Sequence, residues 1–162
     1  MVLSIAAIIL IIAIDQLTKK LAVLYLFPDK TFPIIKDVLH MTYVENDGAS
    51  FSILKGQRWF LIAFTGIAMI AITYYLVKKN PKNILERISI VMIMGGGLGN
   101  FIDRVRQGYV VDMVDFRAIN YAIFNVADSF VVVGVILWSV YFLFVEYRQT
   151  HEEKIRNEQD LD

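Results

Sequence analysis

The sequence contains no cysteine among its 162 residues. A disulfide, a thiolate nucleophile and a zinc–thiolate site are therefore excluded, on whichever side of a membrane the loops lie. Histidine is nearly as scarce, because only His40 and His151 occur, and both are remote from the serines of the apolar runs. Serine catalysis with a paired histidine consequently has little support. No H-E-x-x-H motif is present either, so the usual signature of a metalloprotease is missing.

An excess of charge of either sign is also missing, since 16 basic and 16 acidic residues give a formal net charge of zero. No basic surface is predicted, and we expect no nucleic-acid partner. Apolar residues are abundant instead: 57% of the chain is hydrophobic, and the mean hydropathy is +0.55. These values lie far above those of a soluble domain. They predict an α-helical integral membrane protein of one domain.

Four apolar segments are each long enough to cross a bilayer, which takes about 20 residues. The predicted spans are about 2–26, 59–77, 86–105 and 121–147. The first lacks a basic leader and a small-residue cleavage site, so we expect a retained helix and not a signal peptide. Segment 27–58 has short alternating runs rich in β-branched residues, which favour a small sheet outside the hydrocarbon core. The tail, 148–162, has mixed charge and is expected to be solvated.

Basic residues indicate how the chain lies in the membrane. Four of them crowd the short loop around Asn80-Pro81, namely Lys78, Lys79, Lys82 and Arg87. The positive-inside rule makes this loop cytoplasmic, which places both termini inside and segments 27–58 and 105–120 outside. Seven other basic residues would then lie outside, so the orientation depends on the charge density of the short loop.

Two features of the spans have more than one interpretation. Asp15 and Lys19 are one turn apart, and they predict either an ion pair that lets the helix end approach the interface or a polar floor under a site. The glycine-rich run contains Gly95 and Gly99 at the spacing that allows close helix packing in membranes. A nucleotide-binding loop is excluded there, because no strand precedes the glycines and no Gly-Lys-Ser/Thr follows them.

Polar residues gather where the last two spans meet the outer segments. Asn100, Asp103 and Arg104 share one helical face, and Asn125 and Asp128 stand one turn apart. Between these two groups, residues 109–116 form an extended segment that carries Asp112 and Asp115. An ionisable side chain near the bilayer centre costs roughly 2.5 to 3.5 kcal/mol, so such residues are candidates for function. If the four spans pack side by side, these residues lie at one membrane level with Asp15.

Two carboxylates in a poorly hydrated pocket repel each other and are expected to share one proton, which leaves an acid and a base in one site. A water between them can then attack an amide without any nucleophilic side chain. Asp112 and Asp128 are the predicted pair, with Asp115 as an alternative to Asp112. Asn100, Asn125 and Arg104 would orient the carboxylates, and Lys19 would compensate the charge of Asp15. A Mg²⁺ site is disfavoured, because an arginine and two asparagines suit hydrogen bonding better than metal binding.

Five short blocks, in this order, resemble lipoprotein signal peptidase, also called signal peptidase II. The blocks are DQLTK at 15–19, NDGASF at 46–51, GLGNFIDR at 97–104, GYVVD at 108–112 and FNVADS at 124–129. The resemblance implies an aspartyl endopeptidase of the bacterial cytoplasmic membrane that acts near the outer face. Such an enzyme removes signal peptides from diacylglyceryl-modified prolipoproteins among membrane lipids, as a monomer and without a cofactor or metal.

Matched position by position, Asp112 and Asp128 correspond to the catalytic pair of the family. The supporting or substrate-binding positions implied by the resemblance are Asp15, Lys19, Asn46, Gly48, Asn100, Asp103, Arg104, Asn125 and Ala127. Segment 27–58 would be an extracytoplasmic β-cradle, and a short amphipathic helix would lie near 105–120. Asp47 and Ser50 depart from the family pattern, which puts local substrate contacts in question.

A different class of function uses the same residues. The carboxylates could relay protons in a small transporter or channel subunit. A relay needs polar steps through the whole membrane, whereas the inner halves of these spans are apolar, so the sequence disfavours it. A structural assembly factor is the third hypothesis, and it predicts that every aspartate tolerates replacement by asparagine.

Overall fold

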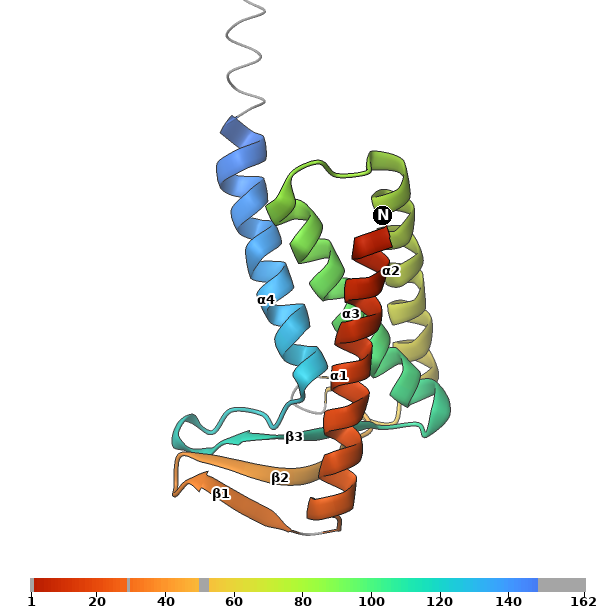
Figure 1. The fold of residues 1–162 in the computed structure, drawn as a ribbon. Coiled ribbons are helices and arrows are strands. Elements are labelled where there is room, and N and C mark those ends of the chain that lie inside the picture. Colours follow the sequence, from red (N-terminus) through yellow and green to blue (C-terminus); the bar gives the residue numbers. More distant parts are fainter. Residues whose placement is uncertain (1, 29, 50–52, 149–162) are drawn as a thin grey trace, which may run out of the picture.

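The computed structural model describes residues 2–28, 30–49 and 53–148, and in it four long helices stand on one small sheet (Figure 1). The helices are α1 (Val2–Leu26), α2 (Arg58–Lys79), α3 (Ile84–Arg106) and α4 (Val126–Val140), and a π-helical turn, η3 (Tyr141–Glu146), continues α4. All four are long and apolar enough to cross a membrane. The predicted tail, with His151, and Ser50 lie outside the described residues.

Local signals set the ends of the α2–α3 hairpin. Asn80 ends α2 in the left-handed conformation, and its backbone N–H donates to the Leu76 carbonyl. Asn83 then begins α3 by accepting hydrogen bonds from the backbone N–H groups of Leu85 and Glu86. Such caps satisfy the orphan backbone groups of a helix end. The first three spans accordingly agree with their predicted bounds to within about two residues.

The sheet has three antiparallel strands in the order β1 (Thr31–Ile35), β2 (Leu39–Asn46) and β3 (Val110–Phe116). Segment 27–58 supplies two of them, as predicted, and the extended segment after α3 supplies the third. The prediction of an amphipathic helix near 105–120 is wrong for this segment. There β3 pairs with β2, and only the short 3-10 turn η2 (Arg117–Ile119) follows. Val44 faces Asp112 and Asn46 faces Val110 across this pair of strands.

The fourth helix starts at Val126 and not near residue 121. Phe124 is held by the sheet, since its N–H donates to the Val114 carbonyl and its own carbonyl accepts from the N–H groups of Met113 and Val114. Asn125 then caps the helix. Pairing with the preceding strand β3 therefore overrides the apolar pattern in this segment.

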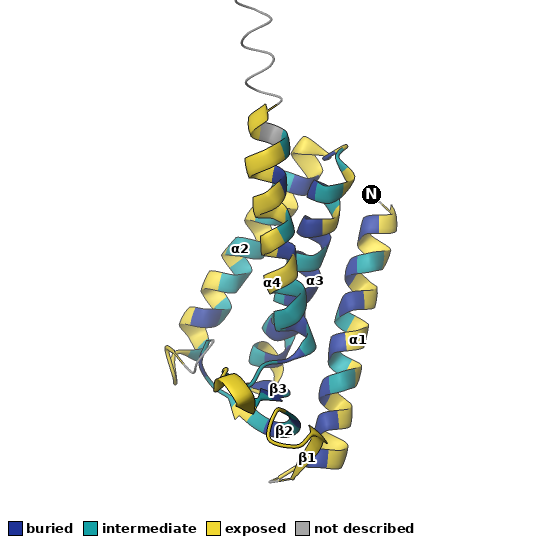
Figure 2. Ribbon diagram, turned by 90° about the vertical axis from the view of Figure 1, so that its left-hand side faces the viewer, coloured by how far each residue is buried: buried dark blue, intermediate teal, exposed yellow. Residues whose placement is uncertain are grey.

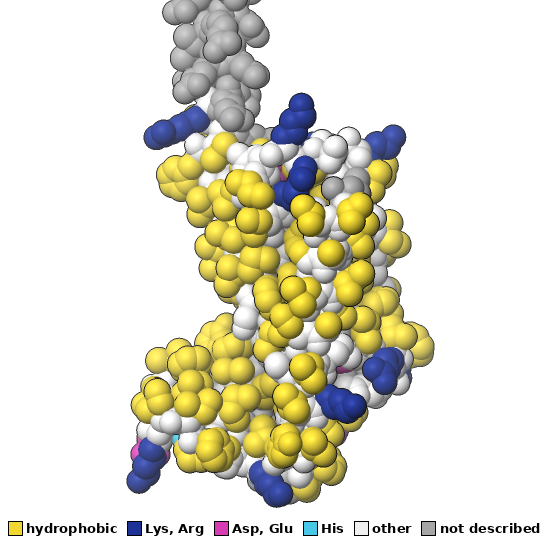
Figure 3. All heavy atoms as spheres, in the orientation of Figure 1, with side chains coloured by type: hydrophobic (Ala, Val, Ile, Leu, Met, Phe, Trp, Pro, Cys, Tyr) yellow, Lys and Arg dark blue, Asp and Glu magenta, His cyan; other side chains and the backbone are white. Residues whose placement is uncertain are grey.

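Helix α3 lies inside the bundle and is the most buried of the four spans (Figure 2). Its glycines permit this position: a Cβ at Gly95 would lie 2.7 Å from Ile11 Cβ, and one at Gly99 would lie 2.6 Å from Asp15 Oδ2. The close packing predicted from the spacing of Gly95 and Gly99 is thus confirmed, and α1 is the helix that packs against these two glycines. The outer faces of α1, α2 and α4 carry exposed apolar side chains. On the face drawn in Figure 3, Lys and Arg side chains gather toward the two ends of this apolar surface.

Candidate active site

The candidate site lies where the sheet meets the bundle, in a cavity of about 430 Å³. Both predicted aspartates line it, Asp112 from β3 and Asp128 from the first turn of α4. The other polar residues lining it are Asn46, Asn100, Arg104, Tyr121 and Ser129. Apolar residues from 122–124 and from α4 line the remainder, so the carboxylates border a largely apolar cavity.

Asn125 contacts both carboxylates. Its Nδ2 donates to Asp112 Oδ1 at 2.6 Å, while its backbone N–H donates to Asp128 Oδ2 at 3.1 Å. Its Oδ1 accepts from the Asp128 N–H at 2.9 Å, which completes a reciprocal cap at the start of α4. The same residue therefore begins the helix and joins the two acidic groups, as the sequence predicted for its orienting role.

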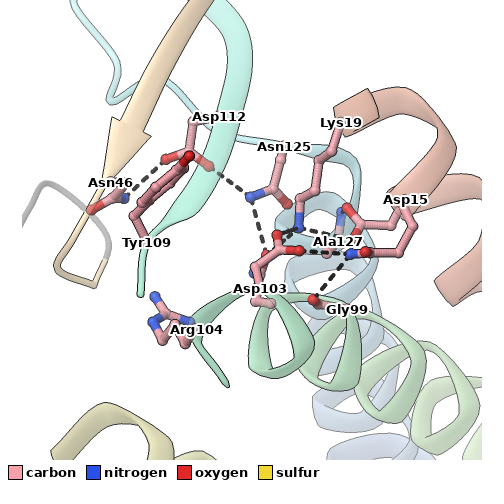
Figure 4. A network of polar contacts seen from close by, with 12 residues as sticks. Asp15, Lys19, Asn46, Gly99, Asp103, Arg104, Tyr109, Asp112, Asn125 and Ala127 are labelled. Carbon is pink, nitrogen blue, oxygen red and sulfur yellow. Dashed lines mark hydrogen bonds and ion pairs between the residues drawn. The ribbon is translucent and has the colours of Figure 1, made fainter. Parts of the chain in front are cut away.

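Each carboxylate also has a partner of its own. Asn46 Nδ2 donates to Asp112 Oδ2 at 2.9 Å, and Asn100 Nδ2 donates to Asp128 Oδ1 at 2.7 Å. Asn46 lies on β2 beside Asp112, as Figure 4 shows. All four carboxylate oxygens thus accept a hydrogen bond from an amide. These bonds fix the direction of both carboxyl groups toward the cavity.

A buried ionic cluster lies next to the two carboxylates and supports them. Lys19 Nζ lies 2.8 Å from Asp15 Oδ2 and 2.7 Å from Asp103 Oδ2, and it donates to Asn100 Oδ1 at 2.8 Å (Figure 4). Asp15 Oδ1 accepts from the Ala127 backbone N–H at 3.1 Å, next to Asp128. The predicted ion pair of Asp15 and Lys19 is present, and both side chains are buried beside the candidate site. Two buried carboxylates share one lysine, and neutral donors, namely the Gln16 amide and the Ala127 N–H, supply their other contacts.

Gln16 belongs to this cluster, although the sequence analysis did not include it among the site residues. Its Nε2 donates to Asp103 Oδ1 at 2.8 Å and lies 3.3 Å from Asp15 Oδ2. It joins the first and third spans. Its place between Asp15 and Lys19 in the DQLTK block was the available signal.

Arg104 ties the loop after β2 to the cavity. Its Nη2 donates to the Gly48 carbonyl at 2.8 Å, and the Gly48 N–H donates to Asn46 Oδ1 at 3.0 Å. Arg104 forms no described hydrogen bond with either aspartate, so it does not orient the pair directly as predicted. Its Nε is buried and has no hydrogen-bond partner among the described residues. A cationic donor therefore stands in the cavity lining.

The structure separates Asp112 from Asp115. Asp115 Oδ2 accepts from Thr42 Oγ1 at 2.9 Å and pairs with Arg117 Nε at 2.8 Å, within the sheet and its edge. Asp112 instead lines the cavity, and burial raises its pKa to about 6. Hydrogen bonds from Asn46 and Asn125 lower that pKa, while the charge of Asp128 raises it.

Comparison with known proteins identifies the group to which this arrangement is similar. The profile of the family described as "Signal peptidase (SPase) II" matches residues 7–144. A protein named lipoprotein signal peptidase from Caldanaerobacter subterraneus subsp. tengcongensis is 44% identical over 142 residues, covering 88% of this chain and 97% of that protein. One of the same name from Streptococcus pyogenes serotype M6 is 43% identical over 135 residues, covering 83% and 89%.

Two solved structures share the fold, and both are described as a bacterial membrane enzyme. One superposes with a TM-score of 0.83 at 34% identity, covering 88% of each chain. The other has a TM-score of 0.80 at 35% identity, covering 90% of this chain and 95% of the other.

Proposed function

Because this chain belongs to the signal peptidase II family, we propose that it removes the signal peptides of diacylglyceryl-modified prolipoproteins, with Asp112 and Asp128 as its catalytic pair. The observation that carries this proposal is the contact of Asn125 with both carboxylates at the border of one apolar cavity. Peptide bonds presented there would meet two acidic groups held in fixed directions. The protein is a multi-pass membrane peptidase.

The two carboxylates divide acid and base roles. Asp112, whose pKa burial raises to about 6, holds the shared proton and donates a hydrogen bond to the scissile carbonyl. Asp128, in the first turn of α4, is the base of the pair. Asp128 takes a proton from a water held between the pair, and the oxygen of that water attacks the carbonyl carbon. The C–N bond then breaks as Asp128 returns the proton to the leaving amine.

The surrounding residues hold this geometry and bind the precursor. Asn46, Asn100 and Asn125 direct the carboxylates, and Lys19, Asp15 and Asp103 fix Asn100 and the backbone at Ala127. Arg104 lines the cavity, and its side chain fixes the loop at Gly48. No cofactor or metal takes part.

The apolar surface around the site supports a lipid-modified substrate. A second apolar groove, between α2 and α4, shares Asn100, Arg104 and Asp128 with the catalytic cavity. The signal peptide and the diacylglyceryl chains would approach from the bilayer along these two openings. The enzyme acts as a monomer at the outer face of the cytoplasmic membrane, with both termini in the cytoplasm, as the positive charge of the α2–α3 loop supports.

Cleavage by the purified protein tests this function. We expect the enzyme in detergent or lipid nanodiscs to cut a diacylglyceryl-modified precursor and to leave the unmodified precursor intact. A proton-coupled transporter would cut neither and would move protons in sealed vesicles. Failure to cut the modified precursor would contradict the proposal.

A further inference from the structure

Arg58 is the first residue of α2, yet its side chain binds the last turn of α3. Its Nε donates to the Arg104 carbonyl at 2.9 Å, and its Nη2 donates to the Val105 carbonyl at 2.9 Å. The guanidinium also lies 5.2 Å from the centre of the Trp59 ring. Arg58 is half-buried and belongs to none of the blocks that define the site.

The two carbonyls that Arg58 binds have no other hydrogen-bond partner among the described residues. The last four carbonyls of a helix have no partner within it, and α3 ends at Arg106. Of these four, Asp103 accepts from the Gln107 N–H at 2.9 Å, while Arg104 and Val105 accept from Arg58. A cation at the carboxyl end of a helix is also favoured by the helix dipole. Arg58 thus keeps the last turn of α3 helical.

Arg58 also packs against the turn that leads to the catalytic strand. Gly108 has φ +91, and a Cβ there would lie 3.3 Å from Arg58 Nη1 and 3.4 Å from Cζ. The guanidinium therefore lies against the Gly108 backbone, four residues before Asp112. Arg58 thus contacts the backbone where α3 ends, at Arg104 and Val105, and again at Gly108, in the turn that leads to β3.

We infer that Arg58 is a positioning residue for peptide-bond cleavage, which it supports by fixing the backbone at Arg104 and the Gly108 turn. The inference rests on the proposed function, because Arg104 and Asp112 are the groups through which Arg58 acts. Small displacements of groups that hold a substrate can reduce rates by about a hundredfold. Removal of the Arg58 hydrogen bonds should therefore lower kcat/KM by more than the accompanying loss of folding stability explains.

The chain offers a matched control at the opposite end of α3. Arg87 Nε and Nη2 both donate to the Pro81 carbonyl, at 3.0 and 2.5 Å. Like Arg58, it uses two guanidinium donors on backbone oxygen near a helix end. Within the described part of the chain, its printed hydrogen bonds go to Pro81 alone, and it does not line the catalytic cavity. Arg87→Ala should lower thermal stability about as much as Arg58→Ala does.

The experiment measures kcat and KM of purified variants on the modified precursor, together with their thermal unfolding. We expect Arg58→Ala to lower kcat/KM about tenfold or more, Arg58→Lys to have an intermediate effect, and Arg87→Ala to stay within about twofold of the parent. Arg58→Lys keeps the charge but cannot bind both carbonyls in the same way, and it serves as the test if the alanine variant does not fold. Because Arg58 acts partly through Arg104, the double variant Arg58→Ala/Arg104→Ala should lose much less activity than the product of the two single effects.

Multiplicative losses in the double variant would show that Arg58 does not act through Arg104, and an equal loss in Arg87→Ala would reduce Arg58 to a general stabiliser; either result would overturn the inference. Those outcomes leave the parent enzyme active. Failure of the proposed function is distinguishable, because the parent itself would then leave the modified precursor uncut.

Discussion

Asn125 shows how one side chain can meet both structural and chemical demands. It begins α4 by accepting from the Asp128 N–H, and it donates to Asp112 across the site. The side-chain amide has an acceptor and a donor at fixed positions, which neither serine nor aspartate offers. This combination explains why an asparagine, and not a serine or an aspartate, stands one turn before Asp128, the second carboxylate of the proposed pair.

The pH dependence of cleavage follows from the environment of Asp112. Its pKa is raised to about 6 by burial and lowered by the Asn46 hydrogen bond. In the proposed mechanism Asp112 acts in its protonated form, so kcat/KM should fall as pH rises through the pKa of Asp112. Asn46→Ala removes a donor that stabilises the anion, which raises that pKa and moves the alkaline limb to higher pH by up to about one unit.

A kcat/KM profile from about pH 4 to about pH 9 checks this shift. Asn83→Ala is the control, because Asn83 caps the opposite end of α3 and should leave the limb in place. A limb that moves to lower pH in Asn46→Ala would assign the acid role to another group.

For single residues, the sequence could predict a place in the site where the residue belongs to one of the five ordered blocks. The pair Asp112 and Asp128 could be proposed from the residues, but Asp115 could be set aside only by the resemblance. The reason lies in long-range pairing: Asp115 faces His40 in the sheet and binds Thr42 and Arg117. Nothing local distinguishes it from Asp112.

At the scale of elements, the glycines of α3 have unequal roles. A Cβ at Gly96 would collide with the Ala127 carbonyl, which is backbone, and would lie 2.8 Å from Val131 Cγ2. A Cβ at Gly97 would instead lie 2.8 Å from Met69 Cε, the flexible end of a side chain. The two neighbouring glycines therefore form a natural test and control.

We predict that Gly96→Ala lowers the free energy of unfolding by about 1 to 3 kcal/mol and strongly reduces cleavage. The added methyl group would push the first turn of α4 away and move Asp128, which follows Ala127. Gly97→Ala should change stability by less than about 1 kcal/mol, because Met69 can move and alanine favours helix. Thermal unfolding and kcat/KM check both variants, and equal behaviour of the two would contradict this packing account.

The helices were predictable because a long apolar run is a local signal. The start of α4 was not, since Phe124 pairs with Val114. The third strand was predicted only as an extended segment, and its place beside β2 depends on contacts between residues about 70 positions apart, such as Val44 and Asp112. The resemblance alone suggested a helix near this segment, and the strand replaces it.

At the scale of the whole molecule, the sheet lies at one end of the bundle, opposite the N-terminus and the far end of α4 (Figure 1). The candidate site, which β3 helps to line, lies at the same end. This layout turns the charge pattern into a prediction about orientation. The Lys-rich α2–α3 loop should face the cytoplasm and the β1–β2 turn should face outward.

The absence of cysteine allows a direct topological test. Lys36→Cys, in the β1–β2 turn, should react in intact cells with a maleimide that cannot cross the cytoplasmic membrane. Lys82→Cys, in the α2–α3 loop, should react only after the membrane is opened. Both positions are exposed, so access depends on the side of the membrane. The reverse pattern would invert the proposed orientation.

The central claim is that two carboxylates act together on one peptide bond. The most direct measurement is single-turnover cleavage of the modified precursor by Asp112→Asn, Asp128→Asn and the control Asp115→Asn, each confirmed to accumulate in the membrane. We predict that the cleavage rates of Asp112→Asn and Asp128→Asn fall by at least about a thousandfold. Asp115→Asn, whose partners are Thr42 and Arg117, should keep most of its activity. Near-normal cleavage by either Asp112→Asn or Asp128→Asn would contradict the account.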